Sequence, residues 1–112
     1  MSTTVSIEQL VQALESGVET LAKSTLGDYM SQAKTDGKNA IDSMKTNLQK
    51  WTLELESGAL TASDVAFLIK EQAALDEMTT LKQAGLDEVK IDQFKSDLIT
   101  MISNTIFNLI KI

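Results

Sequence analysis

A stripe of apolar residues runs along the first half of the chain with a period of eleven residues. Two series of positions are apolar at every eleventh residue: Ile7, Val18, Tyr29, Ala40 and Trp51, and Val11, Ala22, Ala33, Met44 and Leu55. Eleven residues make three helical turns at about 3.67 residues per turn, close to the natural pitch, so the stripe runs nearly parallel to a helix axis. The pattern therefore predicts helix over about residues 6–57.

The segment 35–38 decides how long this helix is. It contains Asp36-Gly37, a turn dipeptide, and glycine inside a helix costs about 1 kcal/mol relative to alanine. A loop would normally disturb the phase of the stripe, yet the eleven-residue step continues across the segment. The preserved phase favours one continuous helix, roughly 78 Å long at about 1.5 Å per residue. The alternative is two helices with a break at 35–38.

Turn signals divide the rest of the chain into two further helices. Gly58 can adopt the left-handed conformation that ends a helix. Thr61 is a candidate N-cap, and Asp64 three residues later completes an acidic form of the capping box. These signals predict a helix over about 62–84, with apolar residues around more than half of its circumference.

The last predicted helix covers about residues 87–111. Ala84-Gly85-Leu86 resembles a Schellman stop before it, with glycine at the left-handed position. Its apolar pattern has a period of seven, which is typical of coiled-coil packing. From Leu98 to Ile110 it contains no charged residue. A helix with apolar residues on two faces must meet two surfaces.

Composition agrees with an all-α fold. The chain has 112 residues, no Pro and five Gly, so little interrupts a helix, and it is short enough for a single domain over residues 1–112. We expect an elongated bundle of three helices with a very long first helix, or of four helices if that helix breaks near Gly37.

The missing residue types exclude much chemistry. The chain has no Cys, His or Arg, so it lacks thiolate and imidazole ligands, an imidazole base and a bidentate phosphate fork. Its net charge of -6 opposes nucleic acid and anionic lipid. No catalytic or phosphate-binding motif is present, and the acidic residues suit solvated helix faces. We expect no enzymatic activity, no metal and no cofactor.

Geometry favours self-association if the first helix is continuous. The two later helices are each roughly 35 Å long, so folded back they cover about half of the first. The uncovered stripe then implies a homodimer or a higher homo-oligomer. The predicted interface residues are Val18, Tyr29, Ala33, Ala40, Met44, Trp51, Leu55, Ile99, Ile102, Ile106, Phe107 and Ile110.

The apolar stripes and the missing residue types predict a non-enzymatic structural or interaction protein that self-associates through apolar helix stripes. One alternative is a secreted or membrane-active protein that uses its uncharged C-terminal helix. Another is a small acidic inhibitor or adaptor that binds a protein partner. The chain shows neither a secretory signal nor the run of about 20 apolar residues that a membrane span needs, so we expect a cytoplasmic location, with signal-independent export left open.

Overall fold

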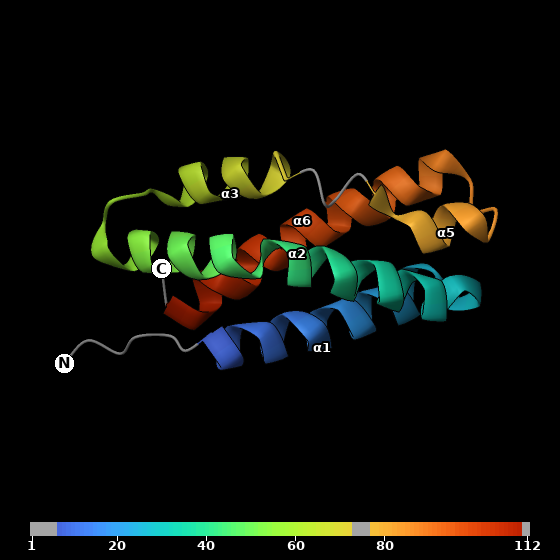
Figure 1. Cartoon of the computed structure of the whole chain (residues 1–112), viewed down its shortest axis with the longest axis horizontal. Helices are drawn as coiled ribbons and strands as arrows, with labels where there is room; N and C mark the ends of the chain where they lie inside the picture. Colours follow the sequence, from blue (N-terminus) through green and yellow to red (C-terminus); the bar gives the residue numbers. More distant parts are fainter. Residues whose placement is uncertain (1–6, 73–76, 111–112) are drawn as a thin grey trace.

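The computed structural model describes residues 7–72 and 77–110, and every regular element in these ranges is a helix. In chain order the elements are α1 (Ile7–Thr25), the 3-10 helix η1 (Gly27–Tyr29), α2 (Met30–Ser57), α3 (Ala62–Lys70), α5 (Thr79–Gln83) and α6 (Glu88–Ile110). They form an elongated bundle with extents of 48 × 22 × 19 Å (Figure 1). The predicted all-α class and helical bundle are confirmed.

The predicted continuous helix over 6–57 is wrong, and so is the predicted position of a break. The chain leaves the helix at Leu26, passes through η1 and begins α2 at Met30. Segment 35–38 lies inside α2, which continues without interruption to Ser57. The segment is therefore divided into two helices, as the alternative prediction has it, but the break lies at Leu26 and not at 35–38.

Hydroxyl hydrogen bonds and a following glycine accompany the end of α1 at Leu26. The hydroxyls of Ser24 and Thr25 both donate to the Leu21 carbonyl, at 3.3 and 2.6 Å. Such side-chain bonds compete with the continuation of a helix, and Gly27 follows with a low helix propensity. Leu26 itself is buried, so the chain reverses around an apolar anchor.

Gly37 lies inside α2 at a point where α1 and α2 pack closely. A Cβ atom at Gly37 would lie 2.6 Å from Cγ1 of Val18, which is closer than real side chains come. Two ion pairs join the same helices, Lys34 to Glu19 at 3.4 Å and Lys38 to Glu15 at 3.8 Å. The order of these contacts shows that α1 and α2 are antiparallel.

The predicted turn after α2 is confirmed. Gly58 has a φ of 88° and caps α2, with its N–H donating to the Leu55 carbonyl. Thr61 and Asp64 then form a reciprocal capping box at the start of α3. The hydrogen bonds from the backbone N–H and the hydroxyl of Thr61 lower the pKa of the Asp64 carboxyl.

The predicted helix over 62–84 is wrong as one element, because the described chain contains α3 and the short α5 instead. Residues 73–76, in the middle of that prediction, lie outside the described residues. α5 is held from a distance by Asp36 of α2. The Asp36 carboxylate is buried and accepts the N–H groups of Thr80 at 3.0 Å and Leu81 at 2.7 Å. The residue before α5, Met78, is buried in a left-handed conformation with φ 33°.

The predicted stop at 84–86 and the final helix are confirmed. Gly85 has a φ of 87°, and the N–H groups of Gly85 and Leu86 donate to Lys82 and Leu81 in the Schellman pattern. α6 covers nearly all of the predicted range 87–111, whose last residue lies outside the described part. Within residues 7–72 and 77–110, no helix combines the length and apolar content that crossing a bilayer requires.

Candidate functional site

The structure places most of the predicted interface residues in the hydrophobic core of the bundle. Eight of the twelve are buried, namely Val18, Ala33, Ala40, Met44, Trp51, Leu55, Ile102 and Ile106, and the other four, Tyr29, Ile99, Phe107 and Ile110, are partly buried against the same core. The premise of an uncovered stripe is therefore wrong. Because the chain reverses at Leu26, the α1 part of the stripe covers the α2 part.

A different surface is distinguished by its lack of charge, and one part of it lies on the second half of α6. The charged residues of α6 are all in its first half, and none follows Asp97 up to Ile110. In the second half, Thr100, Asn104 and Asn108 are exposed at a spacing of four residues. They share one side of the helix, because a spacing of four brings residues to the same face. This side of α6 is polar and uncharged.

The neighbouring side of α1 is uncharged as well. α6 packs antiparallel to α1, and a Cβ atom at Gly17 would meet the Met101 side chain. By helical spacing Ala13, Thr20 and Ser24 lie on the same side as Gly17. These positions are exposed or half-buried, and none carries a charge.

The charged residues of α1 lie elsewhere around the helix. Glu15 and Glu19 turn toward the lysines of α2, with which they form ion pairs. Glu8 lines a small surface pocket together with Lys45 of α2. Lys23 is six residues from Gly17, which places it about a third of a turn away.

We call this surface the α1–α6 face. It consists of Ala13, Gly17, Thr20, Leu21 and Ser24 of α1 and Thr100, Met101, Asn104, Thr105 and Asn108 of α6. A groove of about 420 Å³ runs along it, lined by Leu21 and by α6 residues from Asp97 to Asn108. Asp97 marks the edge of the uncharged region.

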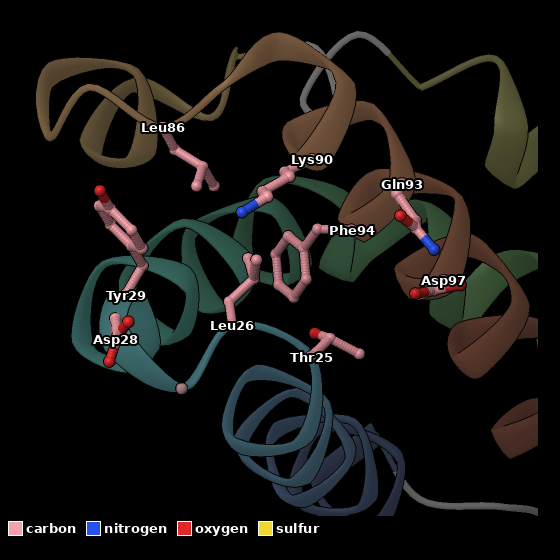
Figure 2. A pocket seen from close by; sticks show the side chains of 10 residues that line it. Thr25, Leu26, Asp28, Tyr29, Leu86, Lys90, Gln93, Phe94 and Asp97 are labelled. Atoms are coloured by element: carbon pink, nitrogen blue, oxygen red, sulfur yellow. The ribbon is translucent and has the colours of Figure 1, made fainter.

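A second concavity continues the groove beyond Asp97, at the reversal of the chain. This cleft has a volume of about 340 Å³ and lies between residues 25–29 and the first half of α6. Figure 2 shows the Phe94 ring beside Leu26, with Lys90 above them and Gln93 and Asp97 farther along α6. Its charges are mixed, because Asp28 and Asp97 accompany Lys90.

The arrangement suits binding rather than bond chemistry. The groove presents hydroxyls, amides, a thioether and the Asp97 carboxylate, and the cleft adds the Lys90 ammonium and the Asp28 carboxylate. Among the residues that the structure describes, no group of three or more Asp and Glu side chains is placed to hold a metal ion. The buried hydroxyl of Ser103 has no hydrogen-bond partner in the described chain.

Sequence reasoning detected only part of this face. It recognised that α6 has no charge after Asp97, but it followed the apolar side of the helix. The useful signal is the spacing of Thr100, Asn104 and Asn108. The α1 part could not be found from sequence, because it depends on which side of α1 packs against α6.

Comparison with known proteins adds no assignment. No known protein family matches the chain, and no curated protein or solved structure is significantly similar to it. The geometry and chemistry of the chain itself are therefore the basis for a proposed function.

Proposed function

We propose that this chain is a non-enzymatic helical interaction protein that self-associates. One observation carries the proposal: Asp97 is the one charged residue that lines the groove of the α1–α6 face, although 23% of the residues in the chain are charged. The interface residues predicted from the sequence are mostly buried, so pairing through them would require the bundle to open. We therefore assign self-association to an exposed surface.

Depletion of charge is a known property of interface cores. A charged side chain covered by a partner loses its hydration and must find an opposite charge. Exposed hydroxyls and amides are less costly to cover, since they can exchange hydrogen bonds with water for hydrogen bonds with the partner. A folded surface without charge is thus suited to contact with another protein.

The side chains available on this surface support a role without catalysis. Ser and Thr hydroxyls need an adjacent base to act as nucleophiles, and the chain contains no His to supply an imidazole. Lys90 lines the cleft beside two carboxylates, those of Asp28 and Asp97. This set of side chains is better suited to contact with another protein than to catalysis.

Sedimentation equilibrium across a wide range of protein concentrations tests the proposal. We expect an average mass that rises from 12.2 kDa toward that of a dimer or a larger assembly. Added salt should leave the association intact, because no opposite charges are proposed to meet. A mass of 12.2 kDa at every concentration up to the millimolar range would refute self-association.

A membrane-active role is a second candidate, favoured by one observation at the end of α6. Phe107, Leu109 and Ile110 are only partly buried, so the last turns of the helix present apolar surface. Flotation with liposomes of neutral and anionic lipids tests this role. Recovery of the chain only in the lipid-free fraction would exclude it.

A further inference from the structure

We propose that Met101 is an oxidation site: a hydroperoxide converts its thioether to a sulfoxide, and this modification loosens the packing of α6 on α1. Met101 lies where the two helices pack together, and it lines the groove of the α1–α6 face. The inference goes beyond self-association and does not depend on it, because the reaction and its effect on stability belong to a single copy of the chain.

The Met101 side chain lies directly against Gly17 of α1. A Cβ atom at position 17 would be 3.0 Å from Cγ and 3.2 Å from Cε of Met101, and closer still to Sδ. The thioether therefore fills the space that a larger residue at position 17 would occupy. On α6, the Thr105 hydroxyl donates to the Met101 carbonyl at 2.7 Å, and its oxygen lies 3.5 Å from Sδ. The sulfur is thus held at the contact between two helices, with one hydroxyl beside it.

Exposure divides the described methionines into two pairs. Met44 and Met78 belong to the core and are at most 2% exposed. Met30, the first residue of α2, is 37% exposed. Met101 is partly exposed and lines a groove of about 420 Å³. A hydroperoxide can reach Met30 and Met101 from solvent, whereas the other two are covered in the folded chain.

The reaction transfers one oxygen atom to the sulfur. The thioether sulfur attacks the terminal oxygen of the hydroperoxide, so that an S–O bond forms and the O–O bond breaks. The leaving oxygen keeps the electron pair of the broken bond and takes up the proton of the transferred oxygen, which releases water or an alcohol. The sulfur is oxidised by two electrons and the hydroperoxide is reduced by two. Methionine sulfoxide reductases reverse the change.

The surroundings of each sulfur decide what the added oxygen does. A sulfoxide oxygen is polar, whereas a thioether sulfur is only a weak acceptor. Met30 is neither in the hydrophobic core nor packed against it, so its sulfoxide can be hydrated. At Met101 the oxygen must fit beside Gly17, or the side chain must leave that contact, and the oxygen competes with the Met101 carbonyl for the Thr105 hydroxyl. Oxidation of Met101 therefore weakens the contact between α6 and α1.

Treatment of dilute folded protein with hydrogen peroxide tests both parts of the inference. By mass spectrometry of peptides, we expect Met30 and Met101 to be oxidised at least about tenfold faster than Met44 and Met78. Met30→Leu and Met101→Leu are matched variants, because each keeps the side-chain volume and leaves one accessible methionine of this pair. Oxidation should raise the unfolding equilibrium constant, measured in urea, about tenfold in Met30→Leu and less than about threefold in Met101→Leu.

Gly17→Ala, introduced into Met30→Leu, tests whether the contact with α1 causes the effect. The new methyl group takes the place of the Met101 sulfur, so the side chain must move toward the groove. We expect Met101 to be oxidised faster in this variant. Its oxidation should raise the unfolding constant less than about threefold, because the contact that the oxygen disrupts is already lost.

Several outcomes would overturn the inference. Oxidation of Met101 as slow as that of Met44 would show that a hydroperoxide does not reach the sulfur. Unchanged stability of oxidised Met30→Leu, or equal losses in both leucine variants, would show that Met101 does not control the packing. If circular dichroism shows that a leucine variant has lost its helical fold, hydrogen exchange of partly oxidised wild type decides. Peptides with the Met101 sulfoxide should exchange about tenfold faster than unoxidised peptides from the same sample, and equal exchange would refute the loosening.

Discussion

The close approach of α1 and α2 at Gly37 leads to a quantitative prediction. A Cβ atom at Gly37 would lie 2.6 Å from Cγ1 and 3.2 Å from Cγ2 of Val18, whereas ordinary van der Waals contact begins near 3.4 Å. Val18 is fully buried and cannot turn away without disturbing its neighbours. Such overpacking costs about 1–3 kcal/mol, and the gain in helix propensity recovers about 1 kcal/mol. We expect Gly37→Ala to lower the free energy of unfolding by up to about 2 kcal/mol.

Gly27→Ala is the matched control. Nothing lies within 4 Å of a Cβ atom at Gly27, and its φ is not in the left-handed region. The substitution should stabilise the chain by about 0.4–1 kcal/mol, because it restricts the unfolded chain without a clash. The same substitution is therefore expected to destabilise the protein at Gly37 and to stabilise it at Gly27.

Urea denaturation provides the measurement, with the fluorescence of Trp51 and circular dichroism as probes. Trp51 is the only tryptophan and is buried, so its emission reports on the core. A double-mutant cycle with Val18→Ala isolates the contact, since that change removes both methyl groups that a Cβ atom at Gly37 would meet. In this background Gly37→Ala should become stabilising. If Gly37→Ala stabilises the wild-type chain as much as Gly27→Ala does, the close packing of the two helices is refuted.

Three further predictions concern polar groups. Asp36→Asn should lower the free energy of unfolding, measured in urea, by about 2–3 kcal/mol, because an amide offers one acceptor oxygen to two backbone N–H groups. Equal stability of the variant and the wild type would show that the carboxylate does not cap α5. Ser103→Ala should raise the free energy of unfolding by about 1 kcal/mol in the same assay, since it removes a buried hydroxyl without a partner in the described chain. A loss of stability would instead show that the Ser103 hydroxyl makes a hydrogen bond. The pKa of Asp64 is lowered from 3.8 in the folded chain, so its stabilising effect should be complete above that pH and disappear as the pH falls through the lower folded value. Unfolding of wild type and Asp64→Asn at a series of acidic pH values should therefore show a difference that shrinks with acidification, and a constant difference would contradict this account.

Local signals were readable from the sequence, and contacts between distant segments were not. Gly58, Gly85 and the Thr61–Asp64 pair act within a few residues of their own positions, and each has the predicted role. The prediction of one long helix was wrong because the phase of an apolar stripe can continue across a break in the helix. Two antiparallel helices that cover each other both need an apolar side, so their patterns can continue in phase across a reversal.

The α1–α6 face shows the same limit. The absence of charge after Asp97 is visible in the sequence, whereas the pairing of that side of α6 with the small residues of α1 is not. Asp36 is a similar case, since it belongs to a turn dipeptide by sequence and caps a helix 44 residues away in the structure. Both features depend on tertiary contacts that local propensity does not encode.

The Asp36 cap also has a consequence for the order of folding. α5 has five residues, too few to be stable by itself in water. Its first N–H groups are satisfied only when α2 is already helical and Asp36 is in place. α5 should therefore form after the α1–α2 hairpin, with φ-values near zero, and its amides should exchange through local opening more readily than those of α2. A carboxylate contributed by a distant helix makes the shortest helix a late and dependent part of the folding pathway.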